Sequence, residues 1–136
     1  YFCNLSYKQD LWAVAYVVLG GCSDDGFDYF RFWLIAQGRE VFYNALENAD
    51  TLCDVFSELE DPEGEDYPEQ EDLAYAVKTV LQERTGNEDY LYTVEDNYSL
   101  PQNIQEIEFE WEEDDEESIR KICPRTFDKW WENDVF

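Results

Sequence analysis

The chain of 136 residues has 34 acidic and nine basic side chains, so its formal net charge is −25, and 18% of its residues are aromatic. A disordered acidic tail carries few aromatic residues, because it lacks the apolar surface that would offset the entropy lost on ordering. In this chain the aromatic side chains are numerous enough to form the core of one folded domain, which we expect to span residues 1–136. The charge argues against direct binding to nucleic acid or to anionic membranes, since both need cationic contacts.

Apolar residues at helical spacing predict a mainly α fold, a compact multi-helix domain with irregular acidic loops. Asp10 is expected to cap a buried helix over 11–19, which Gly20 and Gly21 end, because glycine readily adopts the left-handed conformation that closes a helix. Further helices are expected over 26–37, 39–47, 51–59 and 69–85, the last closed by Gly86.

The other segments are less regular. Nine of the fifteen residues in 58–72 are acidic, which predicts a solvated loop. Residues 87–103 hold several tyrosines and are expected to lie across the helices as an ordered arm. Apolar and acidic residues alternate over 106–112, which is typical of a short extended edge segment. A helix is expected from about 113 to 123, stopped by Pro124, and then a final turn.

The four cysteines, at positions 3, 22, 53 and 123, are widely spaced and form no C-x-x-C pair. We therefore expect reduced thiols and a cytoplasmic protein. The longest apolar run is nine residues, far short of the roughly 20 that span a bilayer, so no membrane association is expected. The chain opens on Tyr1 within what looks like structured sequence, and we expect a segment upstream to be missing.

Residues 20–38 read GGCSDDGFDYFRFWLIAQG. This run resembles the core signature of a family of small, mostly bacterial proteins catalogued as domain of unknown function 4240. Pro124 and Arg125, which follow an acidic helix, resemble the end of the family more loosely. The resemblance implies a mostly helical domain whose members usually start one helix before Tyr1, with the acidic runs as additions of this chain. The family has no established activity, so it implies no mechanism.

The chain contains no histidine, which removes the commonest general base and metal ligand. Ser-His-Asp and Cys-His catalysis are therefore impossible within this chain, and zinc would need the four scattered cysteines to converge. Residues 61–72 place acids at several calcium-loop positions, but Gly64 is at the fourth position instead of the sixth and Pro68 intrudes. We predict no cofactor and no catalytic residue.

The loop before the second long helix is one candidate binding site, formed by Ser23, Asp24, Asp25, Asp28 and Arg31. Its carboxylates could gather a hard cation such as magnesium, a small polar ligand or an arginine of a partner. The alternative is structural: Ser23 or an Asp caps the helix, and Arg31 pairs with Asp28 or Asp24.

The second candidate is an acidic-aromatic strip formed by Glu108, Phe109, Glu110, Trp111 and Glu112. As a docking strip, its rings would supply buried anchors and its carboxylates would orient a cationic partner. Alternatively, it is a solvated edge whose charges repel strand addition.

The sequence thus favours an acidic, non-catalytic protein-binding module that engages a basic partner surface, in the manner of an inhibitor, an immunity protein or a nucleic-acid mimic. Two alternatives stay open. One is a carboxylate-based metal-dependent enzyme centred on residues 22–31. The other is a structural subunit whose acidity is only adaptive. The sequence leaves the oligomeric state open.

Overall fold

The computed structural model describes residues 1–61, 64, 66–86 and 106–132. Its elements are all helical, which confirms the predicted mainly α fold, and no strand occurs within these ranges. The elements are α1 (Phe2–Leu5), α2 (Gln9–Val18), α3 (Asp24–Ala36), α4 (Arg39–Glu47), the 3-10 helix η1 (Ala49–Thr51), α5 (Leu52–Ser57), α6 (Glu71–Thr85), α8 (Glu116–Ile122) and α9 (Pro124–Trp130).

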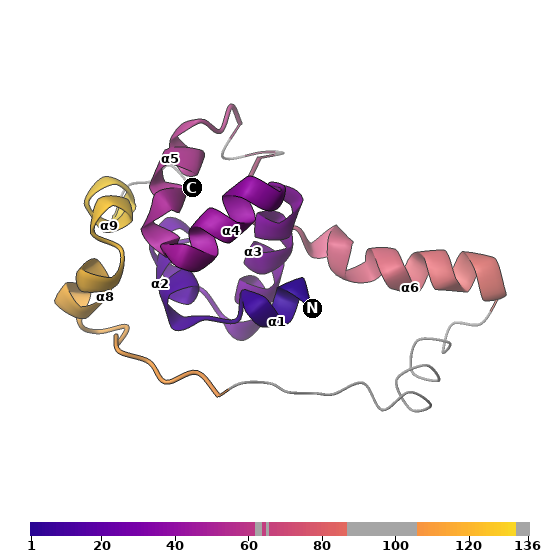
Figure 1. The fold of residues 1–136 in the computed structure, drawn as a ribbon, viewed down its shortest axis with the longest axis horizontal. Helices are drawn as coiled ribbons and strands as arrows, with labels where there is room; N and C mark the ends of the chain where they lie inside the picture. The colour runs from indigo at the N-terminus through magenta and orange to yellow at the C-terminus, as the bar shows by residue number, and fades with distance from the viewer. Residues whose placement is uncertain (62–63, 65, 87–105, 133–136) are drawn as a thin grey trace.

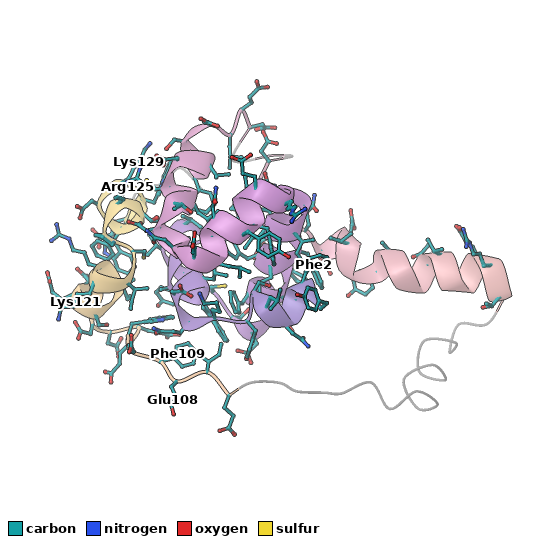
Figure 2. All side chains as sticks on the ribbon, in the orientation of Figure 1. Phe2, Glu108, Phe109, Lys121, Arg125 and Lys129 are labelled. Carbon is teal, nitrogen blue, oxygen red and sulfur yellow. The ribbon has the colours of Figure 1, made fainter. Side chains whose placement is uncertain are left out.

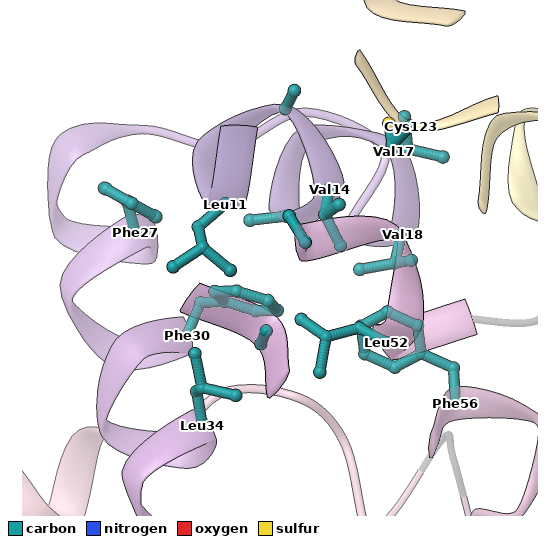
Figure 3. Close-up of a cluster of buried hydrophobic side chains, with 14 of the residues drawn as sticks. Leu11, Val14, Val17, Val18, Phe27, Phe30, Leu34, Leu52, Phe56 and Cys123 are labelled. Carbon is teal, nitrogen blue, oxygen red and sulfur yellow. The ribbon is translucent and has the colours of Figure 1, made fainter. Parts of the chain in front are cut away.

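Helix α2 lies at the centre of the core, as its almost wholly apolar sequence predicts. Figure 3 shows Leu11, Val14 and Val18 of α2 facing side chains from α3 and α5, with Cys123 behind Val17. The facing side chains are Phe27, Phe30 and Leu34 of α3, and Leu52 and Phe56 of α5. Helices α8 and α9 pack on the other side of α2, so the C-terminal segment helps to bury it (Figure 1).

Helix α6 extends away from the bundle (Figure 1). It contacts α3 near its start, where the backbone N–H of Gln70 donates to the carbonyl of Tyr29 at 3.0 Å. Leu73, Tyr75 and Val80 along it are exposed. Gly86 ends the helix in the left-handed conformation, as predicted.

Several predicted boundaries need correction. Helix α2 begins at Gln9 with Lys8 as its N-cap, so Asp10 lies inside the first turn, where its carboxylate accepts from the N–H of Leu11 at 2.9 Å. The helix expected over 51–59 is the shorter α5, and η1 precedes it because the side chain of Asn48 accepts from the N–H of Asp50 and starts a separate turn. Pro124 begins α9 rather than only stopping α8, which suits its fixed φ.

Residues 106–112 are extended, but no described strand pairs with them, so they are not the edge of a sheet. The arm expected over 87–103 lies outside the described residues. Within the part of the chain that the structure places, no helix combines the length and the apolar composition needed to cross a bilayer.

Candidate protein-binding surface

The strip residues 108–112 are held against the start of α2 by the side chain and backbone of Gln9. The N–H of Glu110 donates to Oε1 of Gln9 at 2.9 Å, and Nε2 of Gln9 donates back to the carboxylate of Glu110 at 3.1 Å. The indole N–H of Trp111 donates to the carbonyl of Gln9 at 3.0 Å. Farther along, the N–H of Glu112 donates to the hydroxyl of Ser118 at 3.0 Å. This segment therefore has a fixed shape although it is neither helix nor strand.

The two rings of the strip differ in their exposure. Trp111 is buried, whereas Phe109 is 49% exposed. The Phe109 ring lies edge-on to Trp111 at 5.5 Å and to Trp12 of α2 at 5.4 Å between centroids. Trp12 is itself fixed, because its indole N–H donates to the carbonyl of Cys22 and its ring stacks on Phe27 at 4.5 Å. Phe109 is thus an exposed ring that packs against Trp12 and Trp111, whose indole N–H groups are hydrogen-bonded to backbone carbonyls.

The rings continue into an aromatic band along α2 and α9. Trp111 lies 5.5 Å from Tyr16, Tyr16 lies 6.4 Å from Trp131, and Trp131 stacks on Phe127 at 4.9 Å. We define the aromatic band by its six members, Trp12, Phe109, Trp111, Tyr16, Trp131 and Phe127. Burial raises the pKa of the Tyr16 phenol, and the charges of the nearby carboxylates at positions 113 and 114 raise it further. The acidic segment therefore lies beside this band.

Most carboxylates of the acidic segment, residues 106–116, have no partner within the part of the chain that the structure describes. Within the described residues, six side chains between 106 and 116 make neither a hydrogen bond nor an ion pair. They are those of Glu106, Glu108, Glu112, Glu113, Asp114 and Glu116. Their charges are left to interact with solvent or with another molecule.

The basic side chains are unevenly distributed, and two of them, Lys8 and Lys121, line a pocket together with Glu106, Glu108 and Glu110. Four of the nine lie in residues 120–129 of α8 and α9. Figure 2 shows Lys121, Arg125 and Lys129 on this side of the molecule, away from Phe2 at the opposite side. Arg125 contacts Asp54 at 2.5 Å, and an Arg–Asp pair at positions 120 and 128 is 2.8 Å apart. Arg120 and Arg125 therefore pair with carboxylates outside the 108–112 strip.

The structure places the residues of the 23–31 loop in capping and pairing positions. The Ser23 hydroxyl accepts from the N–H of Gly26 at 3.2 Å and caps α3. Asp24 and Asp25 follow in the first turn, where both side chains are exposed and their charges suit the helix dipole. Asp28 contacts Arg31, the pair expected from the sequence.

Arg31 is the buried member of the loop. Its Nη1 donates to the carbonyl of Cys3 at 2.6 Å, and its guanidinium lies 4.9 Å from the ring centroids of both Tyr7 and Phe27. It therefore joins α1 to α3. Because Asp28 is paired with Arg31, the loop does not bring its three carboxylates together. No group of three or more potential metal-ligating side chains occurs among the residues that the structure describes.

Two other candidates for chemical activity are the Cys22 thiol, which burial protects, and the 61–72 loop, in which a carboxylate accepts hydrogen bonds from the backbone. Burial raises the pKa of the Cys22 thiol to about 12, with smaller contributions from the charges of Glu69 and Asp24. In the partly described 61–72 loop, the carboxylate of Asp66 accepts from the N–H groups of residues 60 and 61 at 3.1 and 3.0 Å.

Several members of this surface were missed from the sequence, among them Trp12 and Glu113. The sequence placed Trp12 in a wholly buried helix, whereas its ring is only partly buried. The signal available was its residue type, since tryptophan is rarely buried completely. Glu113 was assigned to a helix start, but α8 begins at Glu116, which leaves Glu113 beside the strip.

A family model described as "Protein of unknown function (DUF4240)" matches residues 1–83. None of the curated proteins and none of the solved structures matches the chain. The family-matched region contains α2 and the 23–31 loop, whereas the acidic strip lies beyond it.

Proposed function

Because the chain belongs to the DUF4240 family, whose description assigns no activity, we propose from its surface chemistry that it is a non-catalytic, acidic protein-binding module for a basic partner. One observation carries the proposal: carboxylates with no partner among the described residues lie on a hydrogen-bonded segment beside partly exposed aromatic rings. Rings of this kind supply the anchors of protein interfaces, and the charges steer and orient an oppositely charged partner.

The rigidity of the strip supports this function. Gln9 and Ser118 fix the backbone of residues 110–112 by hydrogen bonds, so these residues need no ordering when a partner arrives. A surface that is ordered beforehand loses less conformational entropy on binding. Inhibitors, immunity proteins and nucleic-acid mimics would all use such a surface, and the unpaired cysteines suit a cytoplasmic setting.

The two alternative functions are less well supported. A metal-dependent enzyme at residues 22–31 would need carboxylates that converge, but Asp28 pairs with Arg31 and Ser23 caps the helix. An acidity that is only adaptive would make the position of the charges unimportant. That alternative predicts that charges inside and outside the strip can be neutralised with equal effect.

The test compares two variants of equal net charge. One carries Gln in and beside the strip, at positions 106, 108, 112 and 113, and the other carries Gln at four exposed positions elsewhere, 40, 47, 58 and 60. Binding to cationic proteins is measured by co-purification from the native host and by titration. The strip variant is expected to lose binding and the control variant to keep most of it. At about 1 M salt, where the Debye length falls to about 3 Å, binding by the unmodified protein should weaken strongly. Equal losses in the two variants would contradict the proposal.

A further inference from the structure

A small pocket opens between the strip and α2. It has a volume of about 330 Å³ and is lined by Trp12, Phe109, Trp111, Glu112 and Glu113. Hydrogen bonds from the two indole N–H groups to backbone carbonyls fix two of its walls. Phe109 forms the exposed wall, and Figure 2 shows it beside Glu108 on the extended segment.

The pocket combines two features that attract the same kind of ligand. The Phe109 ring is inclined by 69° to Trp12 and by 87° to Trp111, so the ring planes that line the pocket are not parallel to that of Phe109. The face of an aromatic ring is negative and attracts cations, and indole does so best. The side chains of Glu112 and Glu113 add two carboxylates with no hydrogen-bond or ion-pair partner in the described structure.

No cation of the described chain occupies these rings. The cation–π contacts formed within the described residues are those of Arg31 with Tyr7 and Phe27, Arg39 with Tyr43, and Lys129 with Trp130. The basic side chains of α8 and α9 that form ion pairs do so with acids at positions 54, 117 and 128. Among the described residues, the pocket is therefore a negative, ring-lined cavity with no cation of the chain on its rings.

We propose that this pocket binds the guanidinium group of an arginine side chain on the partner protein, an inference that rests on the proposed function. Arginine suits the pocket better than lysine for two reasons. Its planar group stacks on aromatic faces, and its fixed fork of N–H groups can donate to a carboxylate in pairs. It is also more weakly hydrated than an ammonium group, so its transfer to a ring-lined cavity costs less.

The first experiment uses three synthetic peptides that differ only in one repeated side chain: arginine, lysine or citrulline, the neutral analogue of arginine. Binding is followed by tryptophan fluorescence, because Trp12 and Trp111 line the pocket. The arginine peptide is expected to bind about tenfold more tightly than the lysine peptide of equal charge. The citrulline peptide should bind most weakly.

The second experiment pairs each pocket variant with a control. Phe109→Ala removes the exposed ring, and Phe2→Ala removes a ring of similar exposure (46% against 49%) on the other side of the molecule. Glu113→Gln is compared with Glu47→Gln, an exposed acid of α4. Phe109→Ala and Glu113→Gln should abolish most of the preference for arginine over lysine, and the two controls should preserve it. Circular dichroism checks that all four variants are folded.

The outcomes separate this inference from the proposed function. If arginine and lysine peptides bind equally and Phe109→Ala changes neither, the arginine pocket is wrong while the acidic docking surface stands. If no cationic peptide binds at low salt, both proposals fail. A preference for arginine that survives Phe109→Ala and Glu113→Gln would place its recognition elsewhere and would also overturn the pocket.

Discussion

The buried carboxylate of Asp50 accepts hydrogen bonds from both the backbone N–H and the hydroxyl of Thr126, each at 2.8 Å. The same carboxylate accepts from the N–H of Arg125 at 3.0 Å. It thereby satisfies two of the free N–H groups at the start of α9. Because Asp50 lies in the family-matched region and Thr126 beyond it, this contact fastens the C-terminal helices to the bundle.

Replacing Asp50 should therefore loosen α9. Asp50→Ala leaves three buried or half-buried donors without their acceptor, and we expect the free energy of unfolding to fall by about 2–4 kcal/mol. Thr126→Val removes only the hydroxyl bond and should cost about 1 kcal/mol. Urea unfolding measures both. If the two variants cost the same, the backbone N–H bonds contribute little, and this explanation of how α9 is held would be wrong.

The Asp28–Arg31 pair should be strongly asymmetric. Arg31→Met removes the donors to the carbonyls of Cys3 and Phe27 and is expected to destabilise the protein by about 2–4 kcal/mol. Asp28→Asn should cost less than about 1 kcal/mol, because the Asp28 side chain is 51% exposed and its charge is screened by solvent. Thermal or urea unfolding of the two variants decides this. A larger loss of unfolding free energy for Asp28→Asn than for Arg31→Met would contradict this asymmetry and would show that the Asp28 carboxylate is important for stability.

The junction between α3 and α4 depends on Gly38. Its backbone has φ 95° and ψ 173°, a conformation that side chains other than hydrogen rarely allow. An added Cβ would touch nothing within 4 Å, so any cost of Gly38→Ala comes from backbone strain and not from a clash. We expect a loss of about 1–3 kcal/mol in unfolding free energy. An unchanged urea midpoint would show that the junction relaxes without this conformation.

Two of the four thiols, those of Cys22 and Cys123, should be protected in the folded protein. Burial, followed by nearby acidic charges, raises the pKa of Cys22 and of Cys123 to about 12. Only the thiolate is alkylated, so at about pH 8 iodoacetamide should modify both far more slowly in the folded protein than in urea. Mass spectrometry of the digested protein reads each site separately. Rapid modification of Cys22 in the folded state would be inconsistent with its burial.

The same shift sets the sign of a pH effect on stability. The folded thiols hold their protons more tightly than unfolded thiols, whose pKa is about 8.5. Their contribution to stability is therefore complete below that pH. It is lost as the pH rises toward about 12, because the unfolded state releases its protons first. The urea midpoint should fall in this range, and Cys123→Ala should make the fall shallower.

Local signals in the sequence predicted the helices better than their ends. Gly38 and the apolar residues after it predict the helix over 39–47, and α4 has those bounds. The predicted start of α2 was wrong because Asp10 suits both an N-cap position and the first helical turn. Only the packing of Lys8 and Gln9 against other segments places Asp10 in the first turn. Lys8 donates to the carbonyl of Leu46 at 2.6 Å, a contact that no local pattern reveals.

The surface could be predicted only in part for the same reason. The alternation over 106–112 indicated an extended acidic segment with rings, and the structure has such a segment. That Phe109 lies against Trp12 depends on the folding of two distant parts of the chain. The Gln9 bonds that fix the strip are likewise long-range. The 23–31 loop is different, because its cap and its ion pair join neighbours along the chain and were accessible from spacing alone.

The gathering of four of the nine basic residues on α8 and α9 has an effect at a distance. The other five basic residues are spread over the rest of the chain, but this concentration on one side of a body with net charge −25 displaces its centre of charge and gives it an electric dipole moment. In the field of an approaching basic protein it would experience a torque before any atoms touch. The two proteins would then meet with the side away from α8 and α9 facing the basic protein. The molecule would therefore be partly oriented for binding before contact.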